Sequence, residues 1–535
     1  MPLTYFDAFT QFGPRPRSHG SQPWTLDHLI AELQHCSISG ALVACTMQTQ
    51  YDAMHENRRL SKTLEPYDWL FPIWNVHPHW THEMPAPDDL VKMLGDHDVR
   101  AVTIYPQTNQ WFLGSATSRP LFDALQKSRT LTIIDYRDVD LSQQLDIEGL
   151  LGDFPDLPIL LRGVAWSQQR KVVPWLIAHR NAHIAFDYFQ ICNGIEYLSA
   201  YGLEDQLIYC SNAPQMSAGA HRLYVDYADV SDAVKRKVAG ENLSRLLKGL
   251  KPPRDYVNSD EDSLMTEARH GQPLSTLVLD MHAHIVHAGV NGLGAGTVTV
   301  HGDPAGMVKL NKRLGVDGVG IMNWHGTVGV DSQAGTDCAR DALDAFPDYY
   351  WGLGTFDVMH ETAETMRAQM ESLYADHRFL GLKPYPQYGI RYDDPRYDAW
   401  WRFGDERGLY CGLHPTLWWE EAEFDGICPK WPNMTVVGYH VGGDYVFADH
   451  AINLAKKYPN FMCEPTLTPS CCGVIDYIAQ GAGVDRLMYG SDQPMRDPRP
   501  QLGWVVYSRL SLDDKKQVLG GNAKRLLDGI RARQR

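Results

Sequence analysis

The sequence predicts an α/β protein built from two tandem TIM-like (β/α)8 barrels. Its 535 residues exceed what one hydrophobic core usually serves, so more than one domain is expected. Short apolar runs alternate with longer amphipathic segments in both halves, a pattern typical of a parallel sheet covered by helices. A long internal repeat, together with polar residues at the ends of the apolar runs, favours two barrels over a doubly wound open sheet.

The repeat is visible in segments that recur at a nearly constant spacing. Residues 209–214 (YCSNAP) resemble residues 489–494 (YGSDQP) at an offset of 280 (489 − 209). The tripeptide YPQ occurs at 105–107 and again at 385–387, with the same offset. Ordered matches at one spacing indicate a duplicated unit rather than chance similarity.

The repeat also predicts the domain limits. Residues 1–250 form the first barrel and residues 274–535 form the second. The stretch 251–273 between them is rich in Pro, Asp, Glu and Ser, as interdomain linkers commonly are.

Composition excludes several classes of protein. The formal net charge of −16 argues against a nucleic-acid partner, because phosphates would be repelled. No apolar run is long enough to cross a bilayer, and we expect no signal peptide at the N-terminus and no membrane partner. The ten cysteines are scattered, which suits a reducing compartment. We therefore expect a cytoplasmic enzyme with a small-molecule substrate, and the sequence leaves a homo-oligomer open.

Five polar residues of the second half close successive apolar runs. His282 and His284 alternate along one strand, so their imidazoles can point to the same place and clamp a metal ion. This pair alone is weak evidence in a chain with 22 histidines. His414, His440 and Asp492 each end a further run, at the barrel face where catalytic side chains gather.

Taken as a set, these positions resemble the amidohydrolase superfamily. The resemblance rests on the HxH pair of the first strand, single histidines on the fifth and sixth strands, and aspartate in the eighth-strand turn. The segments 381–386 (GLKPYP), 439–443 (YHVGG) and 521–527 (GNAKRLL) resemble its amidohydrolase-related branch. That branch also contains enzymes similar to aminocarboxymuconate-semialdehyde decarboxylase. The resemblance covers residues 275–535, and the first half only through the repeat.

The resemblance implies one divalent metal ion in the second half. Its implied ligands are His282, His284, His414 and Asp492. Zinc suits imidazole and carboxylate ligands, with manganese or iron as alternatives. The implied catalytic residues are Asp492, which would move a proton, His440, which would polarise the substrate, and Lys383. Lys383 would bind a substrate oxyanion, although some relatives carry a carboxylated lysine that bridges two metals.

The same ligand set serves more than one reaction. Our first expectation is a hydrolase that attacks an amide, lactone or related carbonyl of a small molecule through a metal-activated water. The alternative is a metal-dependent nonoxidative decarboxylase of a small carboxylic acid, aromatic acids included. A catalytically inert binding protein is the second alternative, because the first half already lacks the site.

Reading the first half through the repeat indicates a degenerate, metal-free and inactive barrel. The residues at the corresponding positions are Phe9 for His282, Gln11 for His284, Thr103 for Lys383, Tyr136 for His414, Gly163 for His440 and Asn212 for Asp492. Few of them can bind a metal ion. We hypothesise that this half is an internal pseudo-dimer partner of the active barrel. A fully active 275–535 fragment would refute that hypothesis.

Weaker signals surround the predicted site. Glu464 ends the seventh apolar run and could assist proton transfer. Trp324, Trp418 and Trp419 follow strands and could stack on a flat substrate, although core packing is the more common role of tryptophan. Arg391 could pair with a substrate carboxylate or form a surface ion pair. The histidines of the segment 77–82 are expected to face solvent.

Overall fold

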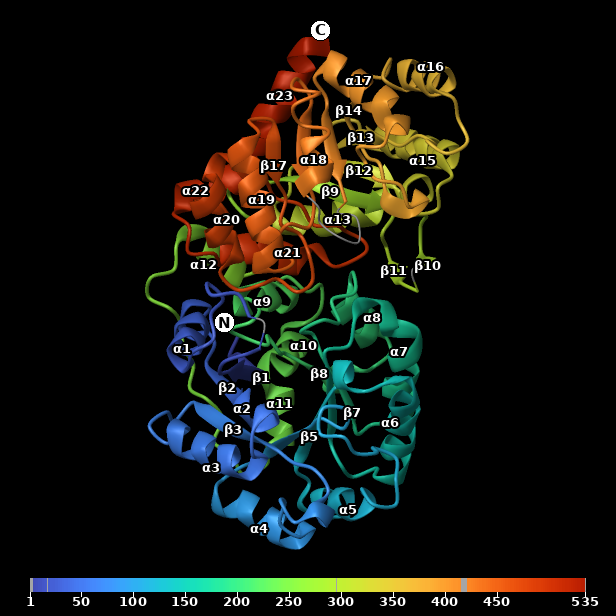
Figure 1. Ribbon diagram of the computed structural model, residues 1–535. Coiled ribbons are helices and arrows are strands. Elements are labelled where there is room, and N and C mark those ends of the chain that lie inside the picture. Colours follow the sequence, from blue (N-terminus) through green and yellow to red (C-terminus); the bar gives the residue numbers. More distant parts are fainter. Residues whose placement is uncertain (1–2, 17, 295, 415–420, 535) are drawn as a thin grey trace. The chain divides into compact units, whose positions relative to one another are not determined.

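The computed structural model describes residues 3–16, 18–294, 296–414 and 421–534, so Trp418 and Trp419 lie outside the described residues. The chain divides into two compact units, Met1–Glu261 with Ala295–Val298, and Asp262–Gly294 with Thr299–Arg535. In Figure 1 the first unit runs from blue to green and the second from green to red. The division falls inside the segment predicted as a linker, and helix α12 (Ser263–Arg269) of that segment belongs to the second unit.

The first unit is built around a parallel sheet of eight strands in sequential order. Their bounds are β1 Phe6–Phe12, β2 Gly40–Cys45, β3 Leu70–Asn75, β4 Ala101–Ile104, β5 Leu131–Asp135, β6 Ile159–Arg162, β7 Ala182–Ala185 and β8 Leu207–Ile208. The sheet closes on itself because the Ala8 amide donates to the Tyr209 carbonyl at 3.1 Å, and the Asn212 amide donates to the Phe9 carbonyl at 3.1 Å. The fold class predicted for this half is confirmed.

Helices follow the strands of this barrel. Their bounds are α1 Leu26–His35, α2 Met47–Gln50, α3 Ala53–Leu64, α4 Pro87–Asp96, α5 Arg119–Ser128, α6 Leu141–Asp153, α7 Gln169–Ala178, α8 Gly194–Ala200, α9 Ala218–Asp226, α10 Asp232–Arg236 and α11 Asn242–Leu246. Polar side chains cap the N-termini of some of these helices. Thr25 before α1 and Asp140 before α6 each accept a hydrogen bond from a backbone amide of the first helical turn. Apolar strand residues such as Leu42, Ile73 and Ile133 form the core.

The second unit repeats this plan with seven assigned strands in the order β17-β16-β15-β14-β13-β12-β9. Their bounds are β9 Leu279–Ile285, β12 Gly318–Asn323, β13 Tyr350–Gly354, β14 Phe379–Leu382, β15 Tyr410–Leu413, β16 Thr435–Gly438 and β17 Phe461–Cys463. Single parallel bridges, Cys463 to Leu487 and Ala283 to Gln493, place the segment 487–493 between the two edge strands. This segment takes the place of the eighth strand, so the second unit is also a TIM-like barrel.

The helices of the second unit likewise follow the strands. Their bounds are α12 Ser263–Arg269, α13 Pro304–Leu314, α14 Trp324–Thr327, α15 Ser332–Ala345, α16 Ala363–Leu373, α17 Asp398–Arg407, α18 Glu421–Asp425, α19 Tyr445–Lys457, α20 Val474–Ala482, α21 Pro498–Val506, α22 Leu512–Lys516 and α23 Asn522–Gln534. Strands β10 (Val290–Gly292) and β11 (Val298–Val300) form a separate two-stranded sheet. None of the helices in the described residues has the length and hydropathy that a membrane span requires.

The pairing registers of the two sheets establish which residues correspond. Ala101 pairs with Leu131 in the first unit, as Gly381 pairs with Tyr410 in the second. Counting on from these pairs, His414 corresponds to Asp135. The sequence spacing instead predicts Tyr136. The prediction was wrong by one residue because the connections between strands differ in length, so the offset changes from strand to strand.

Candidate active site

The predicted site residues of the second unit meet where its strands end. His282 and His284 lie on β9, His440 follows β16, and Asp492 lies in the turn after the segment that replaces the eighth strand. His440 and Asp492 have left-handed backbones, with φ of 64° and 58°. Strained backbone of this kind commonly marks functional positions. The Asp492 amide is held by a 2.7 Å hydrogen bond to the His282 carbonyl.

Three of these side chains form a group that can hold a metal ion. His282, His440 and Asp492 are buried, and each offers a donor atom within 4.8 Å of the donors of the other two. His282 Nε2 lies 3.5 Å from Asp492 Oδ1, and His284 Nε2 lies 3.4 Å from the same oxygen. Two imidazoles and a carboxylate are a common donor set for zinc and related divalent ions.

Glu464, which follows β17, orients His282. The distance between His282 Nδ1 and Glu464 Oε2 is 2.9 Å. The other carboxylate oxygen accepts from the Thr466 amide at 2.7 Å, so Oε2 is left to accept from the imidazole. His282 Nε2 is buried without a hydrogen-bond partner among the described residues. Burial raises the pKa of Glu464 to about 8, and a cation bound by the adjacent imidazole would favour its ionised form.

His440 is held in the matching way by the backbone. Its Nδ1 donates to the Thr466 carbonyl at 2.5 Å, which leaves Nε2 for another partner. Burial lowers the pKa values of His282, His284 and His440. The neutral imidazole that results is the form that binds metal ions.

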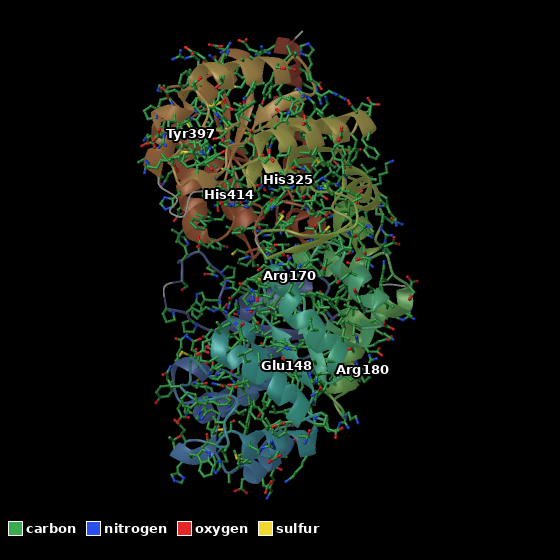
Figure 2. The ribbon with its side chains drawn as sticks, turned by 90° about the vertical axis from the view of Figure 1, so that its right-hand side faces the viewer. Glu148, Arg170, Arg180, His325, Tyr397 and His414 are labelled. Atoms are coloured by element: carbon green, nitrogen blue, oxygen red, sulfur yellow. The ribbon has the colours of Figure 1, made fainter. Side chains whose placement is uncertain are left out.

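His414 occupies the rim of this group. It is half-buried at the end of β15, just before residues that lie outside the described structure. Its ring centre is 4.6 Å from that of His440 and 4.8 Å from that of Tyr385. Figure 2 labels His414 and also His325, the exposed neighbour of Trp324 on α14. In the described structure His440, predicted for substrate polarisation, belongs to the three-donor group and His414 does not.

Two cationic side chains accompany these donors. Lys383, directly after β14, is fully buried, and its Nζ lies 4.1 Å from the centre of the Tyr439 ring. Burial lowers the pKa of Lys383 to about 7. Arg496 Nε lies 3.3 Å from Asp492 Oδ2. Burial alone would raise the pKa of Asp492, but Arg496 and His282 hold it well below its usual range. Asp492 is therefore an anion.

Sequence reasoning missed two residues of this site. Arg496 lies four positions after Asp492, a spacing that could have suggested it. Tyr439 stacks on His282 with ring centres 3.8 Å apart, and its hydroxyl donates to the Met281 carbonyl at 2.7 Å. Trp324, which the sequence did single out, lies beside His284 with ring centres 5.1 Å apart.

Other candidates lie away from the three-donor group. Arg391 forms an exposed ion pair with Asp393 at 2.9 Å. A surface ion pair was one of the two roles expected for this residue, the other being contact with a substrate carboxylate. His77 and His79 are half-buried and His82 is exposed. No potential metal group of three donors includes them within the described residues.

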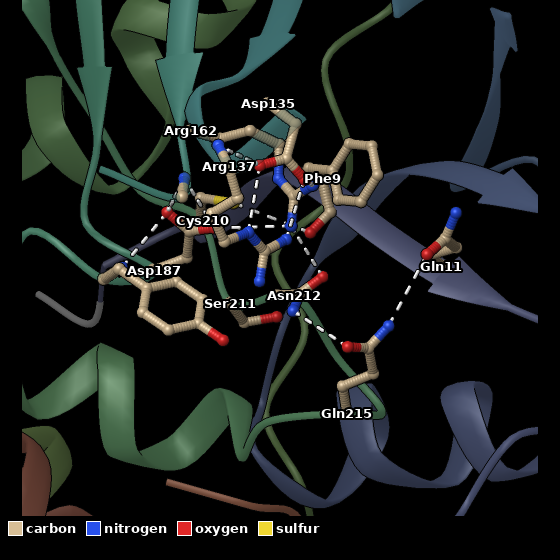
Figure 3. Close-up of polar contacts among 12 residues, drawn as sticks. Phe9, Gln11, Asp135, Arg137, Arg162, Asp187, Cys210, Ser211, Asn212 and Gln215 are labelled. Atoms are coloured by element: carbon tan, nitrogen blue, oxygen red, sulfur yellow. Dashed lines mark hydrogen bonds and ion pairs between the residues drawn. The ribbon is translucent and has the colours of Figure 1, made fainter. Parts of the chain in front are cut away.

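The corresponding positions of the first unit contain a different set of side chains, shown in Figure 3. Phe9, Gln11 and Asn212 stand at the positions of His282, His284 and Asp492, and the backbone bonds that close the two barrels match at these residues. Asp187 lies two residues after β7, whereas Glu464 directly follows β17. Asn212 keeps the left-handed backbone of its counterpart, with a φ of 58°.

A guanidinium lies at the centre of this altered site. Arg162 corresponds to Tyr439, and its guanidinium carbon lies 3.8 Å over the centre of the Phe9 ring. It donates to Asp135 Oδ2 at 2.6 Å and to Asn212 Oδ1 at 2.9 Å. Its distance to Asp187 Oδ2 is 3.4 Å. A cation of the chain itself thus lies between two carboxylates of this barrel, Asp135 and Asp187 (Figure 3).

The histidines and the aspartate of the second barrel lie at its strand ends, the face where barrel enzymes place their catalytic side chains, and they form a donor set that suits a metal ion. The sequence profile of the Amidohydrolase family matches residues 40–249 and 279–529, so the chain belongs to the amidohydrolase family. Both repeats are matched. The family and the donor set together imply a divalent metal ion.

Solved structures resemble about half of the chain. 5-Carboxyvanillate decarboxylase LigW from Sphingomonas paucimobilis is 17% identical, with a TM-score of 0.35, over 48% of this chain and 99% of its own. 2,6-Dihydroxybenzoate decarboxylase from Rhizobium is 14% identical, with a TM-score of 0.39, over 48% and 99%. 4-Oxalomesaconate hydratase LigJ from Rhodopseudomonas palustris is 15% identical, with a TM-score of 0.37, over 48% and 97%. Among curated proteins, none matches the chain.

Proposed function

We propose that the second unit is a metal-dependent hydrolase that acts on an amide, lactone or related carbonyl of a small molecule. The observation that carries this proposal is the buried group of His282, His440 and Asp492, whose donor atoms lie within 4.8 Å of one another. His284 lies at the edge of the same group. The family of the chain is consistent with this class of reaction.

The donor set fits a divalent cation. His282 Nε2 and His284 Nδ1 are buried polar atoms without hydrogen-bond partners in the described structure. Buried nitrogens of this kind are costly unless something occupies them. Neutral imidazoles and an ionised carboxylate suit zinc, with manganese or iron as alternatives. When bound, such an ion supplies Lewis acidity, which polarises a carbonyl and acidifies water.

The protein's own residues would then divide the remaining work. Asp492 is ionised and can accept a proton from an attacking water on its Oδ2 side, where Arg496 now lies at 3.3 Å. His440 has Nδ1 committed to the Thr466 carbonyl, so its Nε2 would either bind the metal ion or, where the other donors hold the ion, polarise the substrate, but not both. Glu464 holds the ring of His282 in place. Trp324 limits one side of the site beside His284.

A second reaction, nonoxidative decarboxylation, is favoured by two buried basic side chains, Lys383 and Arg496. Lys383 has no hydrogen-bond partner within the described residues, and Arg496 lies next to Asp492. Arg496, together with Lys383 when it takes up a proton, would suit a substrate that brings its own carboxylate. In that reaction the carbon–carbon bond to the carboxylate breaks, carbon dioxide leaves, and a proton takes its place.

One experiment separates these reactions. The purified enzyme would be incubated with panels of lactones, amides and aromatic acids in 18O-labelled water. A hydrolase transfers one labelled oxygen to the product acid, whereas a decarboxylase releases carbon dioxide and leaves no label on the ring. Turnover should disappear in Asp492→Asn in either case. Turnover of neither kind on any panel, with metal bound, would favour an inert binding protein.

We also propose that the first unit is metal-free and catalytically inactive. The support is Arg162, whose guanidinium contacts Asp135 and Asn212 at the positions where the second unit has His414 and Asp492, and also Asp187, which lies just beyond β7. A metal ion and this guanidinium would repel each other. In the first unit the guanidinium of Arg162 thus takes the place that a metal ion would take in the second unit.

A further inference from the structure

Three arginines converge at the strand ends of the first unit. Arg15 lies in the segment after β1, Arg137 directly after β5, and Arg162 at the end of β6. The ion pairs of this cluster within 4 Å involve two carboxylates in the described structure: Asp135, with Arg137 and Arg162, and Asp187, with Arg162. The cluster therefore holds more positive than negative charge.

Arg15 is the guanidinium of this cluster that forms no ion pair with a carboxylate among the described residues. It donates to the Gln11 carbonyl at 3.1 Å and to Gln11 Oε1 at 3.4 Å. The Gln215 amide faces it, and with its oxygen turned toward Arg15 it accepts from Nε at 2.8 Å. All of these partners are neutral. Burial, and then the charges of Arg162 and Arg137, lower the pKa of Arg15 to about 10.

The nearby acidic residues are engaged elsewhere. Asp7 accepts from the Ser211 hydroxyl and, at 3.1 Å, from the Ser211 amide. Asp138 accepts from the Thr108 amide and hydroxyl. In the described structure neither is within ion-pair distance of the three arginines. Among the described residues the ion pairs of the cluster thus leave one guanidinium, that of Arg15, without a carboxylate within 4 Å.

The cluster is accessible from the ligand-binding side of the barrel. Arg137 keeps 39% of its side chain exposed, and Arg15 is half-buried. Arg137 binds Asp135 through Nε and Nη2, so Nη1 is outside this pair. Its guanidinium carbon lies 4.8 Å from the centre of the Tyr188 ring, which gives one side of the cluster an aromatic wall. In TIM barrels this face is where ligands bind.

We propose that the first unit binds a small oxyanion, a carboxylate or a phosphate, between Arg15 and Arg137, with Arg162 fixed behind them as a structural cation. Guanidinium groups bind both oxyanions through paired hydrogen bonds. Such a ligand would supply the negative charge that the cluster lacks. The site is separate from the metal centre proposed for the second unit and does not depend on it.

The test is calorimetric titration of the full-length protein with inorganic phosphate and, separately, with benzoate. Each titration would be done on the wild type and on His282→Ala, because an anion bound at a metal in the second unit should be lost in that variant. We expect one saturable site per chain that persists in His282→Ala. Binding of phosphate, of benzoate or of both identifies the source of the oxyanion.

Matched variants assign the site. Arg15→Gln and Arg137→Gln should each weaken binding at least about tenfold, the loss expected for a charge-assisted hydrogen bond. Arg129→Gln, an exposed arginine with a long 3.7 Å pair to Asp156, should bind like the wild type. Thermal unfolding would show that each variant is folded. Absence of saturable binding, or binding unchanged in both Arg15→Gln and Arg137→Gln, would overturn the proposal.

Discussion

Glu464 lies 2.9 Å from Nδ1 of His282, and this contact leaves Nε2 of the same ring directed at Asp492, 3.5 Å away. The pair joins β17 to β9, two strands at opposite ends of the assigned sheet order. An outer carboxylate that holds a metal-binding imidazole raises its basicity and fixes its orientation. We therefore expect Glu464 to act through His282 and not on the substrate.

Replacing Glu464 by glutamine tests this relationship. Glu464→Gln keeps the shape of the side chain but removes its charge, so we expect metal affinity to fall about 10- to 100-fold. The measurement is a metal-competition titration with a chelator. The matched control is Glu421→Gln, which alters a His–Glu pair of the same 2.9 Å length at the surface, with His450. Equal affinities in both variants would contradict the role given to Glu464.

Lys383 is expected to serve the substrate and not the metal. Its Nζ is buried against the Tyr439 ring at 4.1 Å. Lys383→Met should therefore retain the full metal content of the wild type while turnover falls. A stoichiometric loss of metal in Lys383→Met would instead indicate a carboxylated, metal-bridging lysine. Metal analysis and activity assays on the same preparation distinguish the two results.

Arg162 is expected to be required for the stability of the first unit. Arg162→Met leaves Asp187 without its partner and takes one of two arginines from Asp135. Breaking a buried ion pair from one side typically costs about 3–5 kcal/mol. Urea unfolding followed by circular dichroism would measure the loss. The control Arg119→Met breaks an exposed pair with Asp153 and should cost less than about 1 kcal/mol. Similar values for the two variants would refute the assignment.

His183 on β7 should make stability depend on pH. Burial lowers the pKa of His183 to about 3, and its Nδ1 has no hydrogen-bond partner within the described residues. The unfolded chain, where histidine keeps a pKa near 6.5, binds the proton first. Stability is therefore unaffected above that value and falls as the pH drops from 6.5 toward 3, by up to about 1.4 kcal/mol per unit.

The matched variants for this prediction are His183→Gln and His55→Gln. His55 has 64% of its side chain exposed, so its replacement should leave the pH dependence unchanged. His183→Gln should flatten the decline of the urea midpoint below pH 6.5. A decline as steep as that of the wild type would show that His183 does not cause it.

Much of this architecture could be predicted because periodicity reports strands directly. The alternation of His282 and His284 and the apolar runs before His440 and Asp492 placed these residues at the ends of strands, where the structure has them. The correspondence of His414 could not be read in the same way. Its equivalent depends on loop lengths between strands, and strand pairing makes it Asp135.

Contacts between distant residues were beyond the sequence. The bond between Arg162 and Asp135 joins residues 27 positions apart that carry no motif, and it is made only when β5 and β6 pair. Arg496 and Asp492 are only four positions apart, a spacing that could have suggested their contact, but its geometry is set by the turn that follows the closing segment. Arg162 and Arg496 are arginines, a residue type that is usually exposed, and only their burial reveals their roles.

The most direct test of the account is the metal content of the purified protein, measured by mass spectrometry for the wild type, His282→Ala and Asp492→Asn. We expect about one divalent ion per chain in the wild type and a loss in both variants, because the donor group lies in the second unit and Arg162 fills the equivalent place in the first. Two ions per chain, no ion after supplementation with zinc or manganese, or an ion retained in both variants would contradict it.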